Sequence, residues 1–120
     1  MKFNWTMPDA LRPYYEKELQ AHDLLLEQGQ VFKAWNHLER AHILGQAYPR
    51  EHTRVHARML AFGLKTKNAR EVFGQLPRLL AGGLKSWAGT IPVGNTGGAH
   101  VSPIKPMPIP PDLQQILDKG

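Results

Sequence analysis

Residues 31–47 read VFKAWNHLERAHILGQA, and apolar side chains recur through this stretch at the three- and four-residue spacing of an α-helix. Ala34, Leu38 and His42 fall on one face of that helix. Pro49 ends the run, because proline lacks an amide donor and disfavours helical backbone in the residue before it. The stretch therefore predicts an amphipathic helix whose inward face carries a histidine.

The segments around this stretch show the same periodicity. Helices are predicted over residues 11–28, 31–47, 50–65 and 69–84, with a short last helix from about residue 112 to 117. Gly29 ends the first helix, and Pro77 is expected to bend the fourth. Because the predicted connections are short, successive helices should lie antiparallel. We therefore expect an all-α fold, an antiparallel bundle of about four helices over residues 9–85.

Residues 86–120 differ from the bundle in composition. Gly94–Gly98 is rich in turn-forming residues. Prolines follow at positions 103, 106, 108, 110 and 111, and they favour an extended path. Apolar residues alternate with these prolines, which predicts a Gly/Pro-rich strap that lies on the bundle rather than a free linker. Residues 1–120 are accordingly expected to form a single domain.

The composition limits the chemistry that this chain can perform. None of the 120 residues is cysteine, so disulfides, thiolate metal sites and cysteine nucleophiles are excluded. The formal net charge is +5, but no recognised nucleic-acid motif accompanies it, and nucleic-acid binding is not favoured. No stretch approaches the roughly 20 apolar residues of a membrane span. A cytoplasmic location is the expectation.

Ligand-type side chains recur on the faces expected to point inward. The pairs are Glu18 with His22, Glu39 with His42, and His52 with His56, each three or four residues apart on a predicted helix. Buried ionisable groups are costly unless they are paired or bind a metal. The pattern predicts a divalent transition-metal site for zinc, iron, manganese or copper. The first candidates are Glu39, His42 and His56, followed by Glu18 and then by His22 and His52.

The type of metal centre stays open. Glu39 and His42 form an E-x-x-H motif like those of di-iron bundle proteins, but those proteins carry two such motifs and this chain carries one. A catalytic metal would activate water or oxygen, with a free glutamate moving protons. A metal-handling accessory role fits equally well, and no reaction is predicted.

Two interpretations compete with a metal. The inward histidines can form a hydrogen-bonded structural network or a metal-free acid–base site. Residues 24–47 also look like one tetratricopeptide helix pair, which predicts a scaffold that binds another protein or a second copy of the chain. Stable tetratricopeptide arrays usually need at least three repeats. This interaction scaffold is the main alternative to a metal-binding function.

Two motifs together resemble a small bacterial family that is a domain of unknown function. They are AWNHLERAHILGQ at residues 34–46 and PVGNTGG at residues 92–98, followed by PMPIP at residues 106–110. The similarity extends over about residues 24–117. The resemblance implies no established activity, substrate or catalytic residue, so the predicted site depends on the residue spacing alone.

Overall fold

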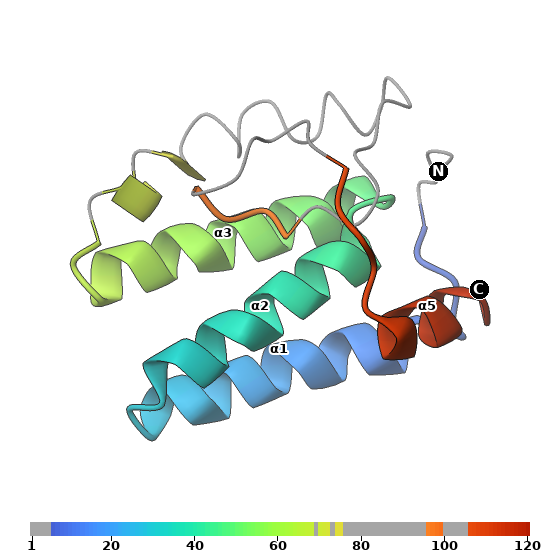
Figure 1. The fold of residues 1–120 in the computed structure, drawn as a ribbon, viewed down its shortest axis with the longest axis horizontal. Helices are drawn as coiled ribbons and strands as arrows, with labels where there is room; N and C mark the ends of the chain where they lie inside the picture. Colours follow the sequence, from blue (N-terminus) through green and yellow to red (C-terminus); the bar gives the residue numbers. More distant parts are fainter. Residues whose placement is uncertain (1–5, 69, 73, 76–95, 100–105) are drawn as a thin grey trace.

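The computed structural model describes residues 6–68, 70–72, 74–75, 96–99 and 106–120, and every regular element in these ranges is helical (Figure 1). The named helices are α1 (Arg12–Glu27), α2 (Val31–Gly45), α3 (Pro49–Lys65) and α5 (Pro111–Leu117). The predicted all-α bundle is therefore confirmed. Residues 70–72 and 74–75 are also helical, within the range predicted for a fourth helix, whereas Pro77 lies outside the described residues.

Helix α2 is the central element, because it packs against α1, α3 and α5 (Figure 1). A tight turn at Gly29 joins α1 to α2, and its φ of +77° is a backbone conformation that glycine adopts without steric cost. Pro49 occupies the first position of α3, where its missing amide donor leaves no helical hydrogen bond unmade. These two residues set the ends of the three long helices close to the predicted positions.

The core lies between the three long helices. Its fully buried side chains include Leu19 of α1, Leu38 of α2 and Met59 of α3, each at most 1% exposed. The Tyr15 hydroxyl donates a hydrogen bond of 2.9 Å to the Glu51 carbonyl oxygen and ties α1 to the first turn of α3. Helix α3 is thereby held with one face toward α2, where the histidines lie.

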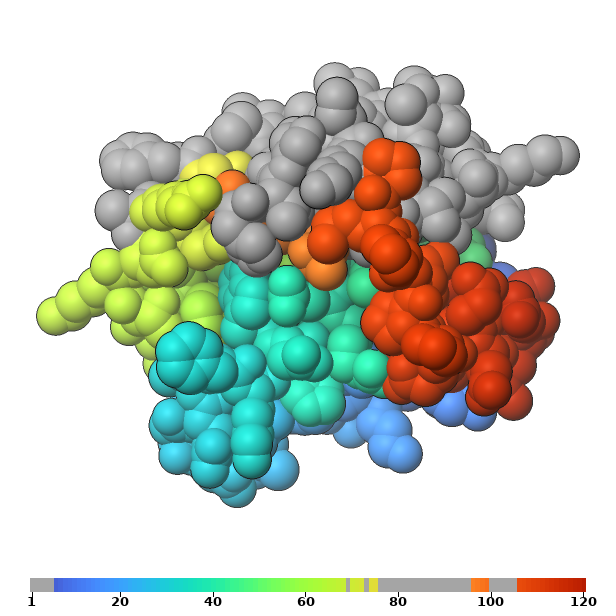
Figure 2. Space-filling view, viewed as in Figure 1, coloured from blue at the N-terminus to red at the C-terminus, as the bar shows by residue number. Residues whose placement is uncertain are grey.

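The C-terminal segment closes over one end of the bundle (Figure 2). Leu113 of α5 is fully buried, and Asp112 forms an ion pair with Arg40 of α2 at 2.5 Å. A helix this short is not stable by itself in water, so its packing against the bundle is what stabilises α5. Among the described helices, none is long and apolar enough to cross a membrane.

Candidate metal centre

Three histidines from two helices meet between α2 and α3. His42 comes from α2, and His52 and His56 lie one turn apart on the facing side of α3. The His42 Nε2 atom lies 3.1 Å from Nε2 of His52 and 3.1 Å from Nε2 of His56, and the last two atoms are 3.0 Å apart. The three residues are between 3% and 8% exposed. We call this group the histidine cluster.

The histidine cluster has the dimensions of a facial metal site. Zinc–imidazole bonds are about 2.0–2.1 Å long, so an ion bound to all three nitrogens would stand about 1 Å out of their plane. The angles between its bonds would then be about 95–100°, between the tetrahedral and octahedral values. The spacing of the three nitrogens therefore allows one ion to bind all of them.

Gln75 determines which nitrogen of His56 carries the proton. The Gln75 Nε2 atom donates to Glu71 Oε2 at 3.0 Å and to the Gly97 carbonyl oxygen at 2.9 Å. This orients Gln75 Oε1 toward His56 Nδ1, at 2.6 Å. Because an amide oxygen only accepts, Nδ1 must donate, and Nε2 of the neutral imidazole presents a lone pair to the cluster. This is the tautomer that a metal ligand requires, held by an outer partner.

The backbone of residues 96–99 covers the His42 ring. A Cβ atom at Gly97 would lie 2.5 Å from His42 Cδ2, closer than carbon atoms approach one another. Gly97 also has a φ of +85°, which favours glycine. The Ala99 amide donates to Glu71 Oε1 at 3.0 Å, so Glu71 and Gln75 together hold this segment over the cluster. Only a residue without a side chain fits at this position.

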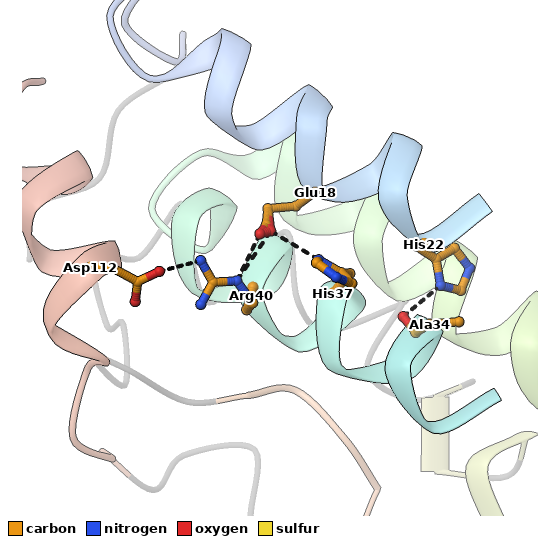
Figure 3. Close-up of polar contacts among 6 residues, drawn as sticks. All are labelled: Glu18, His22, Ala34, His37, Arg40 and Asp112. Carbon is orange, nitrogen blue, oxygen red and sulfur yellow. Dashed lines mark hydrogen bonds and ion pairs between the residues drawn. The ribbon is translucent and has the colours of Figure 1, made fainter. Parts of the chain in front are cut away.

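Of the six predicted ligands, the structure brings His42, His52 and His56 together and places Glu18, His22 and Glu39 outside this group. Glu18 accepts a hydrogen bond from Arg40 Nε at 2.7 Å and lies 3.3 Å from His37 Nδ1 (Figure 3). Arg40 also pairs with Asp112, so Glu18 belongs to an ion-pair chain that joins α1, α2 and α5.

His22 and Glu39 also have other surroundings. His22 lies 2.8 Å through Nδ1 from the Ala34 carbonyl oxygen, which only accepts, so Nδ1 donates and fastens α1 to α2 (Figure 3). Its ring lies 6.0 Å from that of Phe62. Glu39 is half-buried on α2. Within the described ranges, the only group of three ligand atoms near enough to share an ion comes from the histidine cluster.

Sequence reasoning did not single out the residues around the cluster. Glu71 and Gln75 are 7% and 0% exposed and lie in the segment predicted as a fourth helix; Gln75 contacts His56, and Glu71 contacts Gln75. Their four-residue spacing is the signal that could have identified them, since it puts two polar side chains on one helix face. Gly97 lies within Gly94–Gly98, a stretch whose composition predicts turns and no particular contact.

The fold and the cluster define a class, a small helical-bundle protein with three buried histidines that converge through Nε2. The chain belongs to the family described as "Protein of unknown function (DUF3703)", whose model matches residues 9–117. The resemblance to a family without an established activity is thus confirmed. Comparison with curated proteins and with solved structures found no match to this chain.

If the histidine cluster holds a metal ion, replacing Gln75 by alanine should weaken its binding by about 10- to 100-fold, the usual effect of losing an outer partner of a ligand histidine. The variant removes the acceptor that holds His56 Nδ1–H. Zinc affinity would be measured by competition with a chromophoric chelator. Gln114→Ala is the matched control, because Gln114 is exposed on α5 and bonds to Asp118, the residue that follows this helix. Equal affinities in the two variants would contradict the role assigned to Gln75.

His22 should make the fold sensitive to acid. Burial lowers its pKa below the usual 6.5, and this outweighs the opposing effect of the hydrogen bond to Ala34. The unfolded chain therefore binds the proton more readily, and stability is lost as the pH falls from about 6.5 through the lowered pKa. His22→Gln keeps a donor for the Ala34 oxygen and should lose less stability between pH 7 and pH 5.

Urea unfolding with chelator present measures this effect without a contribution from bound metal. The difference between wild type and His22→Gln isolates this residue from the other histidines. His37→Gln is the control, because His37 is only half-buried. Parallel pH profiles for wild type and His22→Gln would show that His22 is protonated equally easily in both states.

Proposed function

We propose that this protein binds one divalent transition-metal ion through the Nε2 atoms of His42, His52 and His56. The observation that carries the proposal is the convergence of three buried imidazole nitrogens at 3.0–3.1 Å from one another. Two imidazoles that close repel each other strongly when both are protonated, and water has little access to the group. A metal cation bound by the lone pairs of the three Nε2 atoms would take the place of these protons and remove the repulsion between them.

Zinc and copper suit the proposed site best. All three ligand atoms are imidazole nitrogens, which zinc and copper accept readily, whereas manganese favours oxygen ligands. Non-haem iron sites usually add a carboxylate to two histidines, and in the part of the chain that the structure describes, the group of convergent ligand atoms contains no carboxylate. We take zinc as the first ion to test.

A three-ligand site supports either of the two roles that the sequence left open. Structural zinc sites are usually closed by four protein ligands, whereas catalytic sites have three and keep a position for water or substrate. Among the described residues the proposed site has three, and the backbone at Gly97 packs against one of them. We propose an ion with an exchangeable fourth ligand, suited to metal handling or to the activation of water.

Zinc should raise the melting temperature of the chelator-treated protein. A ligand that binds only the folded state adds about 2.7 kcal/mol to the free energy of unfolding when its free concentration is 100 times its Kd. For a chain of this size, that corresponds to a rise of roughly 10 °C. Differential scanning calorimetry with zinc, with magnesium as the control ion, measures the shift. Identical melting temperatures in zinc, magnesium and chelator would refute the proposal.

The interaction scaffold is a second candidate, supported by a different observation. Phe32 is 91% exposed and Leu24 is 56% exposed, and both lie near the turn between α1 and α2. Large apolar side chains exposed together often mark contact surfaces. Analytical ultracentrifugation of wild type and Phe32→Ser tests self-association through this surface, and a monomer at all concentrations for both proteins would exclude it.

A further inference from the structure

A second polar site lies apart from the histidine cluster. A cavity of about 320 Å³ is lined by Arg12 of α1 and by Arg50, Glu51 and Arg54 of α3. None of these residues contributes to the cluster, although Glu51 directly precedes His52 in the chain. The volume is at the lower end of the range for small-molecule sites. We call this cavity the arginine pocket.

The positive charges of the arginine pocket are only partly compensated. Arg12 Nη2 lies 3.1 Å from Glu51 Oε1, and Arg54 Nη1 lies 2.6 Å from Glu16 Oε1. Arg50 is exposed and has no ion-pair partner among the described residues. Among the described residues, three guanidinium groups and one carboxylate line the cavity, a net charge of +2 that falls to +1 when Glu16 beside Arg54 is counted. This excess of positive charge favours the binding of an anion.

Glu51 adds a second requirement for the ligand. Its side chain is 7% exposed, and Oε2 is buried with no hydrogen-bond partner in the described part of the chain. A buried acceptor without a donor costs free energy, so such atoms are rare in folded proteins. A ligand O–H group that reaches this oxygen, after a shift of the side chains that cover it, would remove the cost. The pocket therefore has donors for an anion at its lining and one unsatisfied acceptor buried beside them.

We propose that the arginine pocket binds a phosphate group. A phosphate carries between one and two negative charges near neutral pH, which complements the positive lining, and guanidinium groups bind its oxygens in pairs. Inorganic phosphate keeps at least one O–H group near neutral pH and a phosphomonoester keeps one in part of its population, and that O–H group can donate a hydrogen bond to Glu51. A carboxylate ligand would supply one negative charge and no donor. The phosphate can be free or part of a small phosphomonoester.

Isothermal titration of the full chain with inorganic phosphate tests this site. Arg50→Ala should lower the affinity at least about tenfold, the effect of losing a charged hydrogen bond. Arg58→Ala is the matched control, because Arg58 lies on the same helix, pairs with Asp23 and does not line the pocket. Chelator is present throughout, so phosphate bound to a metal ion cannot contribute to the signal. A failure of the phosphate site can therefore be distinguished from a failure of the proposed metal site.

Two further titrations identify the ligand. Glycerol phosphate that binds tighter than inorganic phosphate would assign the pocket to phosphomonoesters, and the reverse order would assign it to free phosphate. Sulfate has a similar charge but no proton near neutral pH, and it should bind more weakly. Equal sulfate binding would overturn the role of Glu51. Absent phosphate binding, or equal losses in Arg50→Ala and Arg58→Ala, would overturn the site.

Discussion

Substituting His42 by alanine is expected to weaken zinc binding by more than about 100-fold, because changes in outer partners of ligand histidines alone cost 10- to 100-fold. His42 is the single ligand from α2, and its Nε2 lies 3.1 Å from each of the other two nitrogens. Without it, an ion would keep only the two histidines of α3. Competition with a chromophoric chelator at neutral pH measures the affinity.

The control for this experiment is His37→Ala. His37 lies on the same helix, but it is near Glu18 and outside the histidine cluster (Figure 3). Its loss should leave zinc affinity unchanged within about twofold, since surface substitutions away from a site have small effects. Circular dichroism of both variants verifies that the helices are retained. If His37→Ala weakens zinc binding as much as His42→Ala does, zinc binds elsewhere.

Replacing Gly97 by alanine should have the second largest effect. The new Cβ would lie 2.5 Å from His42 Cδ2, and the φ of +85° is strained for any residue with a Cβ. Such a backbone conformation costs about 1–3 kcal/mol before the collision with the ring is counted. The collision should displace residues 96–99 from the cluster. We expect a loss of more than about 2 kcal/mol of stability and at least about tenfold weaker zinc binding.

Gly29→Ala is a closely matched control for Gly97→Ala. Gly29 has a similar φ of +77°, but a Cβ built there meets nothing within 4 Å. Gly29→Ala therefore has a similar backbone strain, but its new Cβ makes no close contact. Hydrogen exchange of the Ala99 amide, which is bonded to Glu71, should accelerate only in Gly97→Ala. Equal destabilisation with unchanged zinc affinity in both variants would show that the His42 contact is unimportant.

The helices were predictable because local signals mark their ends. Pro49 and Gly29 act within one or two residues of their own positions, and the structure places helix ends near both. The pairing of His52 with His56 was also predictable, since residues four apart share a helix face. The spacing of residues along the chain does not determine how α3 is rotated about its own axis. Core packing sets that rotation, and the rotation directs both histidines toward His42.

The different surroundings of Glu18 and His22 depend on partners from other parts of the fold. Glu18 has the spacing of a ligand, but Arg40 and His37 lie within reach on α2 and bind it. His22 satisfies the same pattern and instead reaches a backbone carbonyl at Ala34. Each competing contact forms only after α1 packs against α2. A single helical pattern therefore cannot distinguish an ion-pair residue from a metal ligand.

The contacts around the histidine cluster could not be predicted from the sequence, for another reason. Gln75 bonds to His56 across 19 residues, and to Gly97 across 22 residues. The second of these bonds requires the C-terminal strap to return to the bundle, which no local spacing encodes. The sequence predicted a strap on the bundle but not the segment that meets His42. The role of Gly97 became evident from its distance to the imidazole ring.

X-ray absorption spectroscopy at the zinc edge of the zinc-loaded protein tests whether the histidine cluster holds the ion. We expect one equivalent of zinc that survives dialysis, with nitrogen or oxygen neighbours at about 2.0–2.1 Å. Outer-shell scattering should correspond to three imidazole rings, from His42, His52 and His56. Zinc that is removed by dialysis, or bound zinc with one imidazole or none, would contradict a metal site at the histidine cluster.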